Sequence, residues 1–320
     1  IMAAIISGKL GKLGASQNAV GGTELLAERL IKGSKKELFK NKNIIFNRPD
    51  LYEQYMAAGK NIFYFHDLPN DRMYTNFFES ELVNKFSHFV FNSDYQKEEF
   101  CNKFDFNGRN ISVIKNSINP IEMKQKKYDG KVNLIYHTTP HRGLELLAHC
   151  FPKILAENDK VHLKVFSSLK IYGWDEKDKV FEPLYKKLKN MKNVEYNSNV
   201  SNEEIRKELV NSHIFAYPNI WPESCCLAAI EAMSAKNLLV LPNLAALKET
   251  GSKSKFLYEF TDNHSDHINT FQKQLTHAIQ YVQKQSEDYK LHLDELKIYS
   301  DKNYNLSDYL KKWERVLSNK

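Results

Sequence analysis

Short apolar runs alternate with longer amphipathic stretches along most of the chain. The apolar runs, bounded by polar or turn residues, predict strands at 62–65, 89–91, 112–114, 132–136, 161–166, 194–196, 214–217 and 238–241. The amphipathic stretches predict helices at 24–32, 96–104, 144–155, 182–191, 202–210, 226–235, 269–285 and 307–317. Strands that alternate with helices are typical of an α/β protein with doubly wound parallel sheets.

The alternation is interrupted once, at residues 119–130, where Pro120, several lysines and Asp129-Gly130 precede a new strand. We interpret this stretch as a linker between a first Rossmann-like domain, 1–118, and a second, 131–299. A last helix within 300–320 can fold back onto either domain. Because ligands of such sheets bind at the carboxyl ends of the strands, we expect the functional site in a cleft between the domains.

Composition narrows the function classes. Of 320 residues, 42% are apolar and 27% charged, which excludes a largely disordered chain, and no apolar run approaches the roughly 20 residues of a membrane-spanning helix. The net charge of +7 is spread along the chain, which argues against a nucleic-acid module; it suits anionic ligands and leaves a peripheral contact with anionic lipid open. The four cysteines lack metal-ligand spacing, and no secretory signal is visible, so we expect a reduced, cytoplasmic protein.

Glycines cluster near the start of the chain, and the cluster ends directly before a predicted helix. Gly8, Gly11 and Gly14 precede Gly21 and Gly22, and Thr23 is placed to cap the helix. A helix N-terminus preceded by glycines can bind an anion because backbone N–H groups approach the ligand closely. An ordinary flexible loop explains the same residues equally well.

The loop after the strand 132–136 reads His137-Thr-Thr-Pro-His141-Arg142-Gly143 and opens the next helix. Arg142 can bind a diphosphate with its guanidinium, and His137, Thr138 and His141 add donors. The alternative is that Arg142 lies on the surface and that Pro140 only starts the helix.

The most informative segment follows the strand 214–217 and contains two acids, Glu223 and Glu231, with seven residues between them. Two carboxylates can accept hydrogen bonds from the hydroxyl groups of a polyhydroxyl ligand. The backbone amides of Ser224, Cys225, Cys226 and Leu227 are placed to face phosphates between the acids. Alternatively, Glu223 caps the helix and Glu231 is a surface acid, although the apolar residues around Glu231 argue for burial. Cysteines at a helix start can have a lowered pKa, but small side chains beneath a ligand explain this pair better.

Several further segments match a known family in the same order along the chain: 21–24 (GGTE), 65–67 (FHD), 91–93 (FNS), 113–116 (VIKN), 139–147 (TPHRGLELL) and Trp313 in the last helix. Together with Glu223 and Glu231, they resemble the retaining GT-B glycosyltransferases of the GT4 type (glycosyl transferases group 1). The resemblance covers nearly the whole chain. It implies a GT-B fold, with two Rossmann-like domains facing each other across a cleft.

The resemblance also implies residue roles. Glu231 would accept hydrogen bonds from the ribose hydroxyls of the donor, and Glu223 and His66 would contact the transferred sugar. Arg142 would neutralise the leaving diphosphate, which Gly21 and Gly22 would approach from the other domain.

The chain departs from the family pattern at three points. His137 stands where the family commonly has Arg, Arg142 where it has Lys, and Ser224 where it has Gly. The first departure predicts a weaker or pH-sensitive hold on phosphate. The first domain is also shorter than in the family, which affects the acceptor site most.

These observations predict a metal-independent hexosyltransferase. Its donor would be a UDP- or GDP-sugar, its acceptor a hydroxyl of a glycan, lipid or protein-linked acceptor, and the anomeric configuration would be retained. No cofactor is expected, and the sequence contains no D-x-D metal motif. Two alternatives stay open: a non-catalytic sugar-nucleotide-binding protein of the same fold, and a nucleotide-sugar epimerase of that fold.

Overall fold

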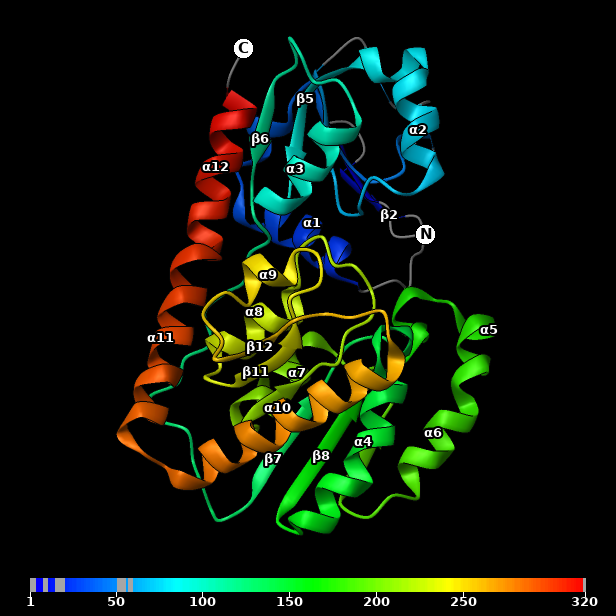
Figure 1. The fold of residues 1–320 in the computed structure, drawn as a ribbon. Coiled ribbons are helices and arrows are strands. Elements are labelled where there is room, and N and C mark those ends of the chain that lie inside the picture. Colours follow the sequence, from blue (N-terminus) through cyan, green and yellow to red (C-terminus); the bar gives the residue numbers. More distant parts are fainter. Residues whose placement is uncertain (1–3, 8–10, 15–20, 51–55, 57–59, 319–320) are drawn as a thin grey trace.

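The computed structural model describes residues 4–7, 11–14, 21–50, 56 and 60–318 of the chain. Within these residues the strands form two six-stranded sheets, one in each half of the molecule, with helices on their faces (Figure 1). Gly8 of the glycine cluster lies outside the described residues, and so do parts of the expected first domain, 1–118, and the last two residues of the segment 300–320.

The first sheet has the strand order β2-β1-β3-β4-β5-β6. Its strands are β1 (Ala4–Ser7), β2 (Gly11–Gly14), β3 (Lys42–Phe46), β4 (Lys60–Tyr64), β5 (Phe86–Phe91) and β6 (Ile111–Val113). Strands β3 to β6 are parallel, whereas β1 is antiparallel to both β2 and β3. The accompanying helices are α1 (Gly22–Gly33), α2 (Arg72–Glu79) and α3 (Asp94–Lys103), with short turns η1 (Lys36–Phe39) and η3 (Glu81–Lys85).

The second sheet is wholly parallel, with the order β12-β11-β10-β7-β8-β9 of a Rossmann fold. Its strands are β7 (Val132–Tyr136), β8 (Val161–Phe166), β9 (Val194–Asn197), β10 (Ile214–Ala216), β11 (Leu238–Pro242) and β12 (Phe256–Tyr258). The helices are α4 (Leu144–Glu157), α5 (Asp175–Asp178), α6 (Glu182–Lys189), α7 (Asn202–Asn211), α8 (Leu227–Ser234), α9 (Leu247–Thr250), α10 (His264–Lys284) and α11 (Glu287–Asn303). Short turns η4 (Pro140–Arg142), η5 (Leu169–Tyr172) and η6 (Lys179–Phe181) complete it.

Each face of the first sheet is covered by a different apolar cluster. One cluster is mostly aromatic and includes Phe63, Phe65 and Phe100. The other places Leu26 of α1 against Trp313 of α12 (Leu306–Ser318). The chain therefore returns to the first domain after completing the second, and Figure 1 shows α12 continuing from α11 up to the first sheet.

The expected fold class is confirmed, and most predicted elements end within a few residues of the observed ones. The expected linker, 119–130, lies between β6 and β7. The pattern did not predict the strands β1, β2, β3 and β12 or the helices α2, α5, α9 and α11. No helix among the described residues is long and apolar enough to cross a membrane.

Candidate functional site

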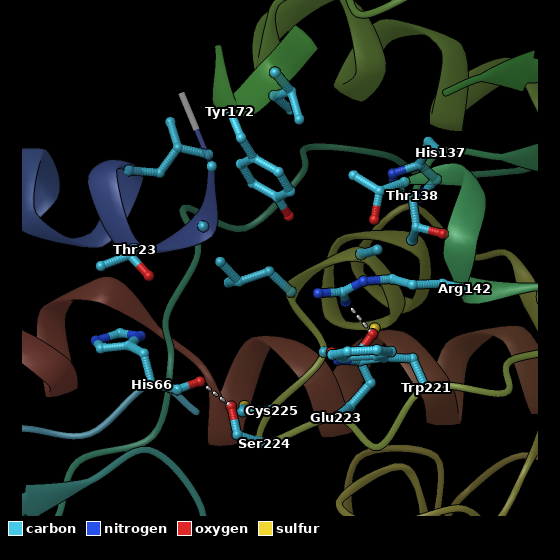
Figure 2. Close-up of a pocket in the computed structure, with 18 of the residues that line it drawn as sticks. Thr23, His66, His137, Thr138, Arg142, Tyr172, Trp221, Glu223, Ser224 and Cys225 are labelled. Atoms are coloured by element: carbon cyan, nitrogen blue, oxygen red, sulfur yellow. Dashed lines mark hydrogen bonds and ion pairs between the residues drawn. The ribbon is translucent and has the colours of Figure 1, made fainter. Parts of the chain in front are cut away.

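A cavity of about 1190 Å³ lies between the two domains and is lined by residues of both. The first domain contributes the start of α1 and the loops after β4 and β5; the second contributes the loops after β7 and β10. Figure 2 shows His66 on one side of this cavity and Arg142 on the other. The cavity therefore lies at the carboxyl ends of parallel strands, where the alternation of elements placed the cleft.

Arg142 and Glu223 come from different loops and form an ion pair inside the cavity. Their side chains are 17% and 7% exposed, so the pair is largely shielded from water. Tyr217, at the end of β10, donates a hydrogen bond from its hydroxyl to Glu223 Oε1 over 2.5 Å. Arg142 Nε is buried and lacks a hydrogen-bond partner among the described residues, so this donor of the guanidinium is unsatisfied in the structure.

These two loops approach each other because Gly143 has no side chain. Gly143 has a φ of 110°, a left-handed conformation that L side chains rarely adopt. A Cβ atom at this position would lie 2.1 Å from the carbonyl oxygen of Pro218. Arg142 was expected at the start of a helix; instead it ends the short turn η4, and α4 begins after Gly143.

Glu231 lies on α8, is only 3% exposed and lines the same cavity. Its Oε1 atom is 3.3 Å from guanidinium nitrogens of both Arg29 and Arg206. Its Oε2 atom accepts a hydrogen bond of 2.9 Å from Asn202. The alternative that Glu231 is a surface acid is therefore wrong. The alternative that Glu223 caps α8 is wrong too, because the N-cap residue is Cys226.

Gly21, Gly22 and His66 of the first domain line the cavity, as expected for residues that face a ligand. His66 Nε2 is buried without a hydrogen-bond partner among the described residues. Gly22 packs against the second domain, since a Cβ atom there would lie 3.0 Å from Leu227. Thr23 does not cap α1: the helix begins one residue earlier than Thr23, Gly21 is the N-cap, and Thr23 is buried in the first turn.

Asp67 follows His66 and also lines the cavity. Burial, and secondarily the nearby Asp71, raise the pKa of Asp67 to about 6. Asn47 holds this part of the wall: its amide donates to Asp67 Oδ2 over 2.7 Å, and its side-chain oxygen accepts from the backbone N–H of His66 over 2.8 Å. Asn47 is fully buried and has a φ of 52°, so the end of β3 is strained to support this wall.

His137 lines the cavity, but its imidazole is neutral at physiological pH because burial lowers its pKa to about 3. Burial likewise lowers the pKa of His66 to about 3. The expectation of a pH-sensitive hold on phosphate through His137 is therefore not supported near neutral pH. The positive charges that line the cavity therefore come from Arg142, Arg48 and Lys177, and Arg142 is the one paired with Glu223.

Ser224, Cys225, Cys226 and Leu227 line the cavity between the two acids. The first of them is bound by the first domain: Ser224 Oγ donates to the carbonyl oxygen of His66 over 2.6 Å and accepts from Asn92 Nδ2 over 3.0 Å (Figure 2). Burial raises the pKa of Cys225 to about 12 and also raises that of Cys226. The idea of a low-pKa thiol is therefore wrong, and the cysteines act as small buried side chains.

Three contributors to the site were not predicted from the sequence. Tyr172, on η5, points its hydroxyl into the cavity (Figure 2), and Trp221, 49% exposed, lines it close to His141. Arg29 reaches Glu231 from the other domain, 202 positions away in sequence. No local pattern distinguishes Arg29 from the other polar residues of its helix, whereas Trp221 stands two residues before Glu223 and could have been noticed.

No group of three or more His, Cys, Asp or Glu side chains with a geometry suited to a metal ion occurs among the described residues. The positively charged group that the cavity offers beside Glu223 is the guanidinium of Arg142.

One family model matches the chain: the model described as glycosyl transferases group 1 matches residues 121–292, more than half of the sequence. The matched region spans the second domain from before β7 into α11 and includes Arg142, Glu223 and Glu231. No curated protein matches the chain.

Solved structures match across both domains. A glycosyltransferase from Rickettsia africae is 15% identical, with 93% of this chain and 81% of that chain covered and a TM-score of 0.67. A UDP-forming α,α-trehalose-phosphate synthase from Burkholderia vietnamiensis is 12% identical, with 84% and 68% covered and a TM-score of 0.65. The pneumococcal O-GlcNAc transferase solved with UDP and GlcNAc is 11% identical, with 83% and 53% covered and a TM-score of 0.61. At these identities the likeness establishes the two-domain fold.

Proposed function

The chain belongs to the glycosyl transferases group 1 family, and from this premise we propose that it transfers a hexose from a UDP- or GDP-linked sugar to an acceptor hydroxyl. The acceptor is a glycan, a lipid or a protein-linked group. The transfer retains the anomeric configuration and uses no metal ion.

The observation that carries the proposal is the arrangement of Arg142, Glu223 and Glu231 along one cavity between two domains. Glu231, at one end of the segment 223–231, accepts hydrogen bonds from the ribose hydroxyls, while Glu223, at the other end, contacts the sugar. The amides from Ser224 to Leu227 lie between the acids and face the diphosphate. A nucleotide sugar has these three parts in this order.

Transfer breaks the bond between the anomeric carbon and the donor phosphate oxygen, and the acceptor oxygen forms its bond on the same face of the sugar. The acceptor proton goes to the leaving diphosphate, which takes up the bonding electrons. Arg142 stabilises this leaving group, because negative charge grows there in the transition state. The hydroxyls of Tyr172 and Thr138 supply neutral donors around the same position.

His66 and the glycines Gly21 and Gly22 close over the donor from the first domain. In a closed cavity, water is excluded and loss of the sugar to hydrolysis is limited. Asp67 lies on the wall of the first domain, where it is placed to accept a hydrogen bond from the acceptor.

Nucleotide binding is the direct test. We expect UDP or GDP, and their sugars, to raise the melting temperature of the protein; a ligand at 100 times its Kd adds about 2.7 kcal/mol of stability. Glu231→Ala should weaken nucleotide binding, whereas Arg142→Ala should lower turnover on the order of 100-fold with a smaller effect on binding. Differential scanning fluorimetry and sugar release from the donor measure the two effects.

Glu157→Ala is the matched control, because this acid is exposed at the end of α4. A wild-type protein that no nucleotide stabilises contradicts the proposal. If nucleotides bind but the donor is neither transferred nor hydrolysed, the non-catalytic binding protein is the correct alternative, and conversion of the sugar without acceptor would indicate an epimerase.

A further inference from the structure

The chain crosses between the domains at two places that lie side by side. Ile118, after β6, donates its backbone N–H to the carbonyl oxygen of Tyr304 over 2.8 Å, and Leu306 donates to the carbonyl oxygen of Ile118 over 3.0 Å. Ile118 also forms a parallel bridge with Asn305. The two connecting segments, 117–120 and 304–306, lie side by side. A movement of one domain against the other would therefore hinge at these segments.

Arg29 contacts both this hinge and Glu231, a residue that lines the cavity. It lies on α1 of the first domain with its side chain 12% exposed. Its Nη1 atom donates to the carbonyl oxygen of Ser117 over 2.5 Å. Its Nη2 atom lies 3.3 Å from Glu231 Oε1 and 3.4 Å from Asn202 Oδ1, both in the second domain.

Arg206 reaches the same carboxylate from within the second domain. Its Nη1 atom lies 3.3 Å from Glu231 Oε1, and its Nη2 atom donates to the carbonyl oxygen of Asn119 over 2.7 Å. Both arginines therefore hold Glu231 and the hinge backbone, but only Arg29 does so from the first domain. Of the two, Arg29 alone fastens the domains directly to each other.

We propose that Arg29 is a positioning residue that couples nucleotide binding at Glu231 to closure of the two domains. This inference rests on the proposed function in one respect, the binding of the nucleotide at Glu231. A guanidinium has donors in a fixed fork, so it can bind the hinge carbonyl and the carboxylate simultaneously only when the domains are close together.

The need for a counter-ion does not by itself explain Arg29. A buried carboxylate needs a charged or hydrogen-bonding partner, and Arg206 and Asn202 already supply both for Glu231 from within the second domain. The additional arginine contributes a contact across the domain boundary. Since coupling between two equilibria is reciprocal, a residue that favours closure through Glu231 also changes nucleotide affinity.

The test compares Arg29→Gln with Arg206→Gln, because each variant removes one guanidinium from the same carboxylate oxygen. Small-angle X-ray scattering of the unliganded protein should give a larger radius of gyration for R29Q than for the wild type, and an unchanged one for R206Q. Both variants should bind UDP about 10-fold more weakly, and kcat at saturating donor should fall about 10-fold in R29Q but change less in R206Q.

If R29Q does not fold, as judged by its melting curve, Arg29→Lys provides the same test, because lysine keeps the charge but lacks the fork. Equal radii of gyration for the wild type and the Arg29 variant, or equal expansion of R206Q, would overturn the proposal and leave Arg29 a simple counter-ion. Failure of the wild type to bind UDP by calorimetry would instead contradict the proposed function, while the scattering comparison of the unliganded proteins would still decide the role of Arg29.

Discussion

At the scale of single residues, burial decides which side chains of the cavity carry charge. His66 and His137 are neutral because burial lowers the pKa of each to about 3. Asp67 differs, since its pKa of about 6 places its titration in an accessible range. The charge beside the expected diphosphate therefore comes from Arg142, and Asp67 gives the pH dependence that experiments can detect.

The elevated pKa of Asp67 predicts a specific pH dependence of stability. In the unfolded chain Asp67 loses its proton near pH 3.8, but in the folded protein it keeps the proton up to about pH 6. Between these values the folded state binds more protons, so the free energy of unfolding falls as the pH rises. Asp67→Asn removes this loss, so the variant should gain up to about 3 kcal/mol relative to the wild type between pH 4 and pH 7.

Urea denaturation at a series of pH values measures this difference. Asn at position 67 keeps an oxygen that can accept the hydrogen bond from Asn47, so the side-chain amide of Asn47 is not left without an acceptor. The exposed Asp159 supplies the control, and Asp159→Asn should follow the wild-type curve. A constant difference between D67N and the wild type across the range would disprove the elevated pKa.

Sequence patterns identified Arg142 and Glu223, because each stands in a loop after a predicted strand, and Glu231, because it follows Glu223 at a recognisable spacing. The partners of those residues were not predictable in the same way. Arg29 is one of several charged residues on a helix, and its contact with Glu231 depends on how two domains meet. Asn47 follows a strand that the pattern missed, so its support of Asp67 had no visible signal.

At the scale of elements, apolar runs located five of the six strands of the second sheet, β7 to β11, to within about one residue. Strands β7 and β8 match their predicted limits, because the apolar residues of each begin and end the strand and polar or turn residues stand outside it. Helix α11 was missed because its apolar residues are sparse along a highly charged stretch. Strand β3 was missed although its three apolar residues form a run as long as the one that predicted the strand at 89–91.

The fit between two loops of the second domain predicts that Gly143→Ala is severely disruptive. The added Cβ would lie 2.1 Å from the Pro218 carbonyl oxygen, and alanine disfavours the φ of 110°. Because the obstacle is backbone, the loops must move apart, and we expect a loss of at least about 2–3 kcal/mol of stability. Activity should fall further, since Arg142 and Glu223 would separate.

Gly108→Ala is the matched control for this variant. Gly108 also has a positive φ, 71°, but no atom lies within 4 Å of a Cβ built there. Its substitution should cost about 1 kcal/mol of backbone strain and leave turnover unchanged. Chemical denaturation and donor turnover of both variants are the measurements, and equal losses for the two would show that contact with Pro218 is unimportant.

At the scale of the whole molecule, the first domain holds the segment before α8 by several hydrogen bonds. Besides the two bonds of Ser224 Oγ, Ser93 Oγ donates to the carbonyl oxygen of Ser224 over 2.6 Å, and Asn116 Nδ2 donates to that of Cys225 over 3.2 Å. From the sequence, Ser224 was expected to contribute its backbone amide to a phosphate site, and its side chain stood out only as a departure from the family's glycine. In the structure its hydroxyl fills a position between the two domains that glycine would leave without a hydrogen-bonding group.

Ser224→Ala should therefore lower turnover more than it lowers stability. The variant loses the bonds to His66 and Asn92, each about 1 kcal/mol, and the two cavity walls are then held less firmly in register. Since small misplacements of reacting groups are costly, we expect kcat to fall about 10-fold while the Kd for UDP changes little. Steady-state kinetics and calorimetry measure the two quantities, and the double variant with Asn92→Ala should show a coupling energy of about 1 kcal/mol.

The matched control is Ser254→Ala, because Ser254 Oγ also makes two hydrogen bonds, with Leu239 and Phe256, but entirely within the second domain. Both serine variants should lose comparable stability in urea, whereas only the one at Ser224 should lose turnover. A Ser224 variant with wild-type kcat, or additive effects of the Ser224 and Asn92 substitutions, would mean that the domains keep their register without this hydroxyl. The bonds that Ser93 and Asn116 donate to the carbonyl oxygens of Ser224 and Cys225, and the contact of Arg29 with Glu231 on α8, would then hold the domains in register.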